Sequence, residues 1–227
     1  MKIAIVAAME EEALIIINNI NDKQKYTYNN FDFHVGKYLN NDIIVTVSGV
    51  GKVASAILST TLVDHFKDID LVISVGVGGG IEGKTEVGEV MIFDEYAYCD
   101  ADATYFNYSY GQIPGCPKTY NGSISSIEKV IDNIAYKKGM ILTGDSFFTN
   151  KDEINSIIEN YFNDKNVLSL DMESCAFAQS FWSLKVPFVT IKVVSDVIGI
   201  SSNDYEKNLN MCTNIAQNTL LTILKKL

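Results

Sequence analysis

The sequence contains no arginine, and all 18 of its basic residues are lysines. Acidic residues number 28, so the formal net charge is −10 at pH 7. Proteins that bind nucleic acid rely on cationic side chains against phosphates, and no basic stripe offsets the negative charge here. The composition therefore argues against a nucleic-acid partner. The absence of arginine also removes the side chain that is best suited to bidentate binding of phosphate.

Cysteine, histidine and long apolar runs are also scarce. The four cysteines have no CxxC spacing, and the only histidines are His34 and His65, which favours neither a disulfide framework nor a zinc site. No segment approaches the ~20 uninterrupted apolar residues of a membrane span. The first apolar run, Ile3 to Ala8, is too short for a signal peptide. We therefore expect a cytoplasmic protein without a metal or organic cofactor.

Short runs of isoleucine and valine alternate with helical patterns. The sequence predicts buried strands at Ile3 to Ala7, Ile43 to Val47, Leu71 to Val75, Gly88 to Phe93 and Phe188 to Val194. Apolar residues at helical spacing predict helices at Val53 to Phe66, Ser174 to Lys185 and Leu209 to Leu227. This alternation is typical of an α/β protein with a mixed, mostly parallel, twisted sheet flanked by helices. Because no linker interrupts the chain, we expect one domain over residues 1–227.

Polar and glycine-rich segments follow the predicted strands. In open α/β sheets ligands bind beyond the carboxyl ends of the strands. The segments expected at that rim are Met9 to Glu12, Ser48 to Lys52, Gly76 to Gly80 and Ser195-Asp196. A long aromatic stretch from Tyr96 to Tyr120 is predicted to be irregular and suits an interface.

Each candidate side chain at the rim also has a plain structural interpretation. Glu12 and Glu173 are acids that suit the first turn of a helix, and Asp196 could cap a turn. Phe147 and Phe148 could be core residues instead of a wall that stacks on a purine. The glycines could make simple turns, and Lys52 could be a solvated charge instead of an anion ligand. Three carboxylates that converge in one cleft would repel one another unless a polyhydroxyl substrate or an attacking water lay between them. Their expected convergence therefore favours a functional site.

Taken in order, several short motifs resemble the 5′-methylthioadenosine/S-adenosylhomocysteine nucleosidases of the purine nucleoside phosphorylase-like superfamily. The match runs nearly from end to end, and together the motifs are highly specific. They are Ala7 to Glu12, Ser48 to Val53, Asp100 to Asp102, Tyr110 to Pro117, Thr143 to Asp145, Met172-Glu173 and Ser195 to Val197.

The resemblance implies a role for each matching residue. Glu12 is implied to be the general base that activates water, and Asp196 the general acid at adenine N7, steadied by Ser195. Glu173 and Met172 are implied to contact the ribose, Phe147 to stack on adenine, and the Phe148 backbone to bind the purine edge. The wall around the 5′-alkylthio group is implied to consist of Met9, Val50 and Tyr205, joined by Phe106 and Pro114 of a second subunit in a homodimer.

Three positions depart from the family pattern. Asp171 stands where the family usually has Glu, a shortening that is expected to change little, and Val77 replaces a frequent Ser in the glycine segment. Lys192 replaces an Arg expected near the base carboxylate. Because an ammonium lacks the planar fork of guanidinium, we expect Lys192 to hold Glu12 and the attacking water differently.

The implied chemistry is hydrolysis of an N-glycosidic bond, with one carboxyl group serving the leaving adenine and another activating water, as in inverting glycosidases. A protonated Asp can donate to adenine N7 and accept from the N6 amino group, which favours 6-aminopurines. A phosphorylase is the main alternative, but the missing arginines favour hydrolysis. The second alternative is a non-catalytic nucleoside-binding protein. The sequence does not distinguish methylthioadenosine, S-adenosylhomocysteine, 5′-deoxyadenosine and related adenine nucleosides as the preferred substrate.

Overall fold

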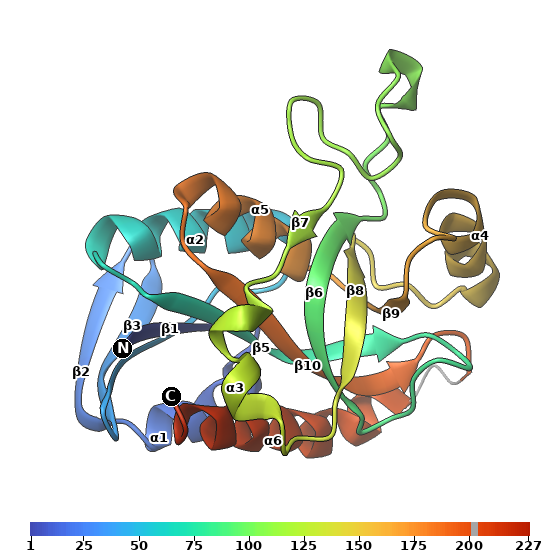
Figure 1. Ribbon diagram of the computed structural model, residues 1–227. Coiled ribbons are helices and arrows are strands. Elements are labelled where there is room, and N and C mark those ends of the chain that lie inside the picture. Colours follow the sequence, from blue (N-terminus) through green and yellow to red (C-terminus); the bar gives the residue numbers. More distant parts are fainter. Residues whose placement is uncertain (201–203) are drawn as a thin grey trace.

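A mixed sheet organises the computed structural model, which describes residues 1–200 and 204–227 (Figure 1). Within these residues the sheet has ten strands: β1 (Lys2–Ala7), β2 (Asn21–Tyr28), β3 (Phe31–Tyr38), β4 (Asn41–Val47), β5 (Leu71–Gly80), β6 (Val90–Tyr98), β7 (Tyr120–Asn121), β8 (Lys137–Thr143), β9 (Val167–Asp171) and β10 (Phe188–Val197).

The sheet combines a parallel centre with a closed ring. Strand β1 lies between β4 and β5, and β5 also pairs with β10, all in parallel. Strands β10 and β6, and β9 and β5, pair antiparallel, while β8 pairs in parallel with both β6 and β9. Strands β5, β10, β6, β8 and β9 therefore form a ring, and the antiparallel strands β2 and β3 extend the sheet beyond β4.

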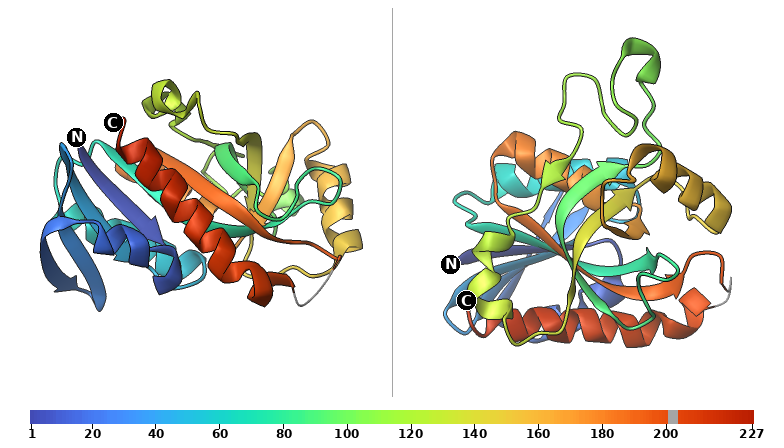
Figure 2. Two further views of the ribbon diagram at one scale, coloured as in Figure 1. Left: turned by 90° about the horizontal axis from the view of Figure 1, so that it is seen from below. Right: turned by 45° about the vertical axis from the view of Figure 1, so that its right-hand side comes forward.

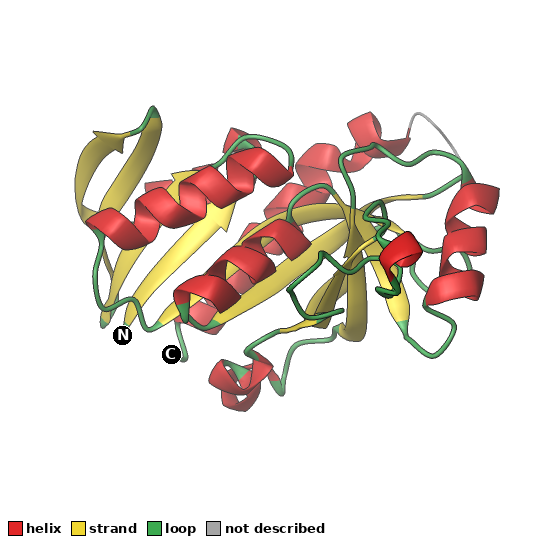
Figure 3. Ribbon diagram, turned by 90° about the horizontal axis from the view of Figure 1, so that it is seen from above, coloured by secondary structure: helices red, strands yellow, loops and turns green. Residues whose placement is uncertain are grey.

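Helices cover both faces of the sheet (Figures 1 and 3). The described helices are α1 (Leu14–Asn18), α2 (Lys52–His65), α3 (Glu128–Ile131), α4 (Lys151–Tyr161), α5 (Ser174–Leu184) and α6 (Asp204–Leu224). Short 3₁₀ turns are η1 (Glu10–Glu12), η2 (Thr104–Phe106) and η3 (Ile124–Ser126). Helices α2 and α5 lie side by side on one face, and α6 runs beneath the other (Figures 2 and 3).

Strand β1 shows how the two faces of the sheet are packed, because apolar side chains leave it in alternating directions. Side chains of successive strand residues point to opposite faces. Ile3 and Ile5 accordingly pack in a core with residues of α1 and α6, whereas Ala4 and Val6 pack in a second core with residues of α2 and α5. A strand that is buried on both faces reads as a continuous apolar run, as the sequence does here.

The predicted α/β fold class, with a mixed sheet flanked by helices, is confirmed. All five predicted strands and all three predicted helices correspond to elements of the structure, although several bounds differ. Helix α6 begins at Asp204, five residues before the predicted start, and Tyr96 to Tyr98 belong to β6. Sequence analysis did not identify β2, β3, β7, β8, β9 or α4.

Two segments predicted to follow strands lie within them instead. Strand β5 continues through Gly80, and β10 continues through Ser195 and Asp196 to Val197. The glycines of β5 are therefore not a turn. They permit close packing, since a Cβ on Gly76 would lie 2.2 Å from Glu12 Oε1, and one on Gly78 would lie 2.7 Å from Ser169 Oγ.

The segment between β6 and β7, residues 99–119, projects beyond α2 and α5 and is called the arm (Figures 1 and 2). It carries η2 and the side chains of Tyr105 and Phe106, which are 90% and 69% exposed. No helix in the described parts of the chain is long and apolar enough to cross a membrane.

Candidate active site

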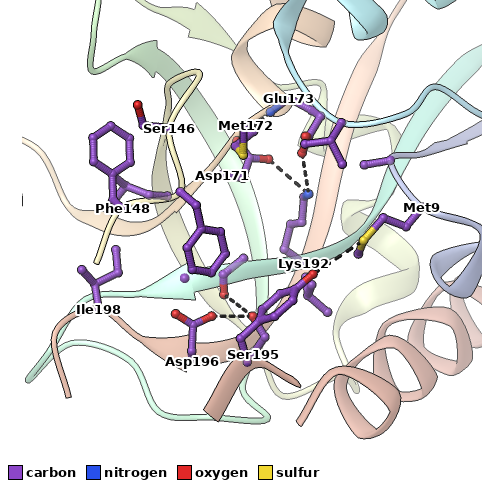
Figure 4. A pocket seen from close by; sticks show the side chains of 18 of the residues that line it. Met9, Ser146, Phe148, Asp171, Met172, Glu173, Lys192, Ser195, Asp196 and Ile198 are labelled. Carbon is purple, nitrogen blue, oxygen red and sulfur yellow. Dashed lines mark hydrogen bonds and ion pairs between the residues drawn. The ribbon is translucent and has the colours of Figure 1, made fainter. Parts of the chain in front are cut away.

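A cavity of about 220 Å³ opens where the carboxyl ends of β1, β5, β9 and β10 meet (Figure 4). Ligand sites are expected at this end of such a sheet. The predicted site residues that line it are Met9, Glu12, Val50, Val77, Phe147, Phe148, Met172, Glu173, Lys192, Ser195, Asp196 and Tyr205. Segments that are far apart in the sequence thus contribute to one concave site.

Glu12 is held by backbone N–H groups of residues that follow β1 and of a residue within β5. Its side chain is 1% exposed and follows β1 within the 3₁₀ turn η1. Oε2 accepts hydrogen bonds from the amides of Ala8 and Met9, each 3.0 Å away, and Oε1 accepts one from Val77, 2.9 Å away. The missing Cβ of Gly76 allows the carboxyl group to approach β5 this closely. Burial raises the pKa of Glu12, opposed by Lys192 and by these three amides.

A second carboxylate, Glu173, lies at the start of α5. It is 4% exposed, and its Oε1 accepts a hydrogen bond from the Gly51 amide, 3.0 Å away. Burial raises the pKa of Glu173 to about 7, while Lys192 and the Gly51 amide act in the opposite direction. This group therefore changes its charge near neutral pH.

Lys192 contacts a different carboxylate from the one expected. Its Nζ lies 3.1 Å from Asp171 Oδ2 and 3.8 Å from Glu173 Oε2, whereas the expected contact was with Glu12 (Figure 4). The negative charge of Glu12 still acts on Lys192. Burial lowers the pKa of Lys192, but the negative charges of Asp171, Glu12 and Glu173 outweigh this effect and raise it overall. Lys192 is therefore a buried cation.

Asp171 is the anchor of this ion pair. Besides Lys192, its carboxylate accepts hydrogen bonds from the hydroxyls of Thr143 and Ser174, at 2.7 and 2.5 Å. It also accepts bonds from the amides of Glu173 and Ser174 at the start of α5. The sequence suggested that an Asp in place of Glu here changes little. In the structure this side chain holds both the helix and the lysine, a role that only the fold reveals.

Asp196 lies on β10, on the far side of Ser195 from Lys192. The Ser195 hydroxyl donates a hydrogen bond to Asp196 Oδ1, 2.8 Å away (Figure 4). The pairing of β10 with β5 shifts register between Val194 and Asp196. Such a bulge re-aims side chains, and here both Ser195 and Asp196 line the cavity.

Apolar side chains form the remaining walls. The rings of Phe147 and Tyr205 meet edge to face, with centroids 5.4 Å apart, and the Tyr205 hydroxyl lies 3.6 Å from Met9 Sδ. Phe147 and Val50 are 57% and 54% exposed, so this part of the cavity is open.

The predicted residues Phe106 and Pro114 do not line the cavity of their own chain. Seven lining positions were not among the predicted site residues: Ala8, Gly78, Gly79, Ser146, Leu170, Asp171 and Ile198. Ala8 and Ser146 adjoin predicted site residues, and Gly78 and Gly79 belong to the segment that was expected at the rim of the sheet. Asp171 stood out in the sequence only as a departure from the family pattern.

The arrangement suits acid–base chemistry on a small polyhydroxyl ligand. Carboxyl groups and aromatic rings line the same cavity: those of Glu12, Asp171, Glu173 and Asp196, and those of Phe147, Phe148 and Tyr205. Among residues 1–200 and 204–227, no cluster of His, Cys, Asp and Glu has a geometry that could hold a metal ion.

Comparisons with known proteins agree with this geometry. The family model described as the phosphorylase superfamily matches residues 2–225. A 5′-methylthioadenosine/S-adenosylhomocysteine nucleosidase of Maridesulfovibrio salexigens is 34% identical over 235 residues, covering 100% of each chain.

Two solved structures have the same fold throughout. The S-adenosylhomocysteine nucleosidase of Streptococcus pyogenes, in complex with 5-methylthiotubericidin, has a TM-score of 0.92 at 32% identity, covering 100% of this chain and 97% of that one. The 5′-methylthioadenosine/S-adenosylhomocysteine nucleosidase of Colwellia psychrerythraea, in complex with adenine, has a TM-score of 0.92 at 31% identity, covering 100% and 96%. The chain therefore belongs to the phosphorylase superfamily and, within it, to the family of the 5′-methylthioadenosine/S-adenosylhomocysteine nucleosidases.

Proposed function

We propose that this protein hydrolyses the N-glycosidic bond of 5′-methylthioadenosine and S-adenosylhomocysteine, releasing adenine and the 5′-thio-substituted ribose. The observation that carries the proposal is one cavity lined by Glu12, Glu173 and Asp196 and walled by Phe147 and Phe148. Relatives of this architecture have been solved with adenine and with a methylthio nucleoside analogue. The reaction is an acid–base displacement at the anomeric carbon.

Asp196 is the proposed general acid. As the bond between C1′ and N9 breaks, its electron pair moves into the purine, and N7 takes a proton from the Asp196 carboxyl group. Adenine then leaves as a neutral molecule. Ser195 donates to Oδ1 of the same side chain and so fixes its orientation. A general acid of this kind typically contributes ~10²–10⁴-fold in rate.

Glu12 is the proposed general base. It takes one proton from water, whose oxygen bonds to C1′ on the face opposite adenine, as in inverting glycosidases. Three amide donors fix its carboxylate, so little reorganisation is needed when the water is activated. Glu173 accepts hydrogen bonds from the ribose hydroxyls in this scheme.

We further propose a homodimer in which the arm completes the neighbouring cavity. Several exposed apolar side chains lie on α2, on α5, in the turn before α2 and on the arm: Val50, Val53, Ile57, Tyr105, Phe106 and Trp182. Exposed aromatic and aliphatic groups that gather on one side of a protein are typical of an interface. Phe106 and Pro114 are assigned to the 5′-alkylthio pocket of the partner.

Cytoplasmic location and roles in methionine salvage and methyl-cycle by-product removal are also proposed. They are supported by the four cysteines, none of which forms a disulfide, and by the substrates that the relatives' names specify.

The proposal is tested with a panel of nucleosides, using released base as the readout. Methylthioadenosine and S-adenosylhomocysteine are expected to yield one adenine per molecule, 5′-deoxyadenosine is the informative third member, and inosine should not react. Adenine binding without release from any member would instead identify a nucleoside-binding protein.

A further inference from the structure

Three charged residues in motifs singled out above have no part in the proposed reaction, and the structure brings them together. Lys52 Nζ lies 2.9 and 2.8 Å from the two carboxylate oxygens of Asp100 and 3.4 Å from Asp145 Oδ2. The lysine also lies over the Tyr98 ring, 5.2 Å from its centroid. Together, Lys52, Asp100 and Asp145 form what is called here the charged triad.

Backbone amides reinforce the charged triad. Asp145 Oδ1 accepts a hydrogen bond from the Lys52 N–H at the start of α2, 3.0 Å away, and Asp100 Oδ2 accepts one from the Asp145 N–H, 2.8 Å away. The side chains of Lys52 and Asp100 are only 24% and 27% exposed. Burial lowers the pKa of Lys52, but its two carboxylate partners outweigh this effect and raise it. Charged hydrogen bonds that are partly shielded from water are stronger than those of exposed ion pairs.

The charged triad joins three segments that each serve the active site. Lys52 ends the turn from Ser48, whose Val50 lines the cavity and whose Gly51 amide binds Glu173. Asp145 begins the loop that carries Ser146, Phe147 and Phe148 along the cavity wall. Asp100 lies at the root of the arm, directly after Cys99.

We propose that Lys52 is a positioning residue, which through Asp100 and Asp145 holds the Gly51 amide against Glu173 and the Phe147–Phe148 loop against the purine. This inference rests on the proposed function for its kinetic test. It assigns to Lys52 neither the solvated charge nor the anion site that the sequence left open, because the ammonium group is already engaged by two carboxylates.

The conformation of Gly51 explains why the turn needs such a support. Its φ of 101° lies in a region that side chains rarely adopt, and glycine brings no side chain that could fix the turn by packing. A Cβ on Gly51 would lie 3.5 Å from Asp145 Oδ1, so the triad lies directly against this residue. Holding the turn from its flank therefore fixes the direction of the Gly51 N–H.

The Gly51 amide acts on the charge of Glu173. The charged and polar groups facing that carboxyl group are Lys192 of β10, Asp171 of β9, Glu12 of η1 and the Gly51 amide. Burial, Asp171 and Glu12 raise the pKa of Glu173, whereas Lys192 and Gly51 lower it. When the amide moves away, the pKa must rise further, and a higher pH is needed to ionise the group that accepts from ribose.

The test compares Lys52→Met with Lys37→Met. Lys37 forms an ion pair of 3.0 Å with Asp42 at the other end of the sheet and provides a matched control. For Lys52→Met we expect KM to rise roughly tenfold, as for one weakened hydrogen bond to a charged group, with a smaller change in kcat. The acid limb of kcat/KM should move to higher pH. Lys37→Met should match the wild type, and Lys52→Arg, which keeps the charge, should restore most of the loss.

A binding measurement separates this inference from the proposed function. Calorimetry with adenine requires no turnover, and we expect Lys52→Met to bind adenine more weakly because the Phe147–Phe148 loop is less well held. If Lys52→Met proves poorly folded, Asp100→Asn serves in its place, since its amide oxygen still accepts from the Asp145 N–H. Unchanged adenine affinity together with an unmoved acid limb in the folded variant would overturn the positioning role. An inactive wild type that binds adenine would overturn only the proposed function.

Discussion

At the level of single residues, the site places charges where they have defined partners. Glu12 accepts three amide hydrogen bonds, Asp171 binds Lys192 and caps α5, and Ser195 orients Asp196. Burial of such groups is tolerated because each has partners. Their substitution should therefore have separable effects on chemistry, binding and stability.

Asp196→Asn tests the proposed acid. The amide keeps the size of the side chain and can still donate a hydrogen bond to N7, but it cannot transfer a proton to the leaving group. We expect kcat to fall by at least ~10²-fold, the lower end for a general acid, while inhibitor affinity survives. The measurement is adenine release and inhibitor binding for the folded variant. A kcat close to that of the wild type would remove Asp196 from the mechanism.

Lys192→Met tests the buried ion pair. Removing the cation leaves Asp171 and Glu173 without their counter-charge, and breaking a buried pair in this way typically costs about 3–5 kcal/mol. We expect a loss in the free energy of unfolding that is larger at pH 8 than at pH 5.5. The reason is that the pKa of Glu173, already raised to about 7 by burial, rises further, so the group is protonated and neutral at the lower pH.

Urea unfolding at the two pH values measures this difference. Lys138→Met, which breaks an exposed ion pair with Asp94, is the control and should change stability by less than about 1 kcal/mol. Equal losses at both pH values for Lys192→Met would contradict the assigned charge states. Because Lys192 contacts Asp171 and Glu173, we also expect KM for the nucleoside to rise, in addition to any effect on Glu12.

At the level of elements, the sequence predicted the buried strands better than the polar ones. Strand β1 is a continuous apolar run, whereas β2 (Asn21–Tyr28) is an exposed, polar edge strand that has almost no apolar alternation to detect. For the glycines of β5 the sequence left a simple turn as one open alternative, because glycine adopts turn conformations readily. Glycine is needed there because the side chains of Glu12 and Ser169 lie too close to leave room for a Cβ. Residues so far apart in the sequence leave no local pattern that would predict these contacts.

In the candidate site, too, the sequence predicted some features and missed others. Motif resemblance placed Glu12, Glu173 and Asp196, and the structure brings all three to one cavity. It could not reveal that Lys192 contacts Asp171, or that Lys52, Asp100 and Asp145 meet, because these contacts depend on long-range packing.

The arm is the element whose role depends on a second chain. Phe106 is 69% exposed and does not line the candidate active-site cavity of its own subunit. If it completes the partner's 5′ pocket, Phe106→Ala should raise KM for methylthioadenosine severalfold and leave adenine affinity nearly unchanged. Kinetics and adenine calorimetry measure the two effects, with Tyr105→Ala as a neighbouring control on the same turn. Sedimentation of the wild type as a fully active monomer would contradict the shared site.

At the level of the whole molecule, the composition bears on which nucleophile reaches C1′. A phosphorylase replaces water by phosphate and must balance its negative charge beside the substrate. This chain has no arginine, and among the described residues the only lysine that lines the cavity is Lys192. That lysine already lies between Asp171 and Glu173. With four carboxyl groups around the same space, the field in the cavity disfavours an anionic nucleophile and admits neutral water.

Turnover should therefore be independent of phosphate. In phosphate-free buffer we expect methylthioadenosine to yield adenine and free methylthioribose at the full rate, and added phosphate should leave kcat/KM unchanged beyond the effect of an equal ionic strength of chloride. Separation of the sugar products distinguishes the two reactions directly, because phosphorolysis leaves a phosphate ester at C1′. A sugar 1-phosphate that accumulates in proportion to added phosphate would show that the cavity accepts the anion, and the charge argument from Lys192 and its carboxylates would then be wrong.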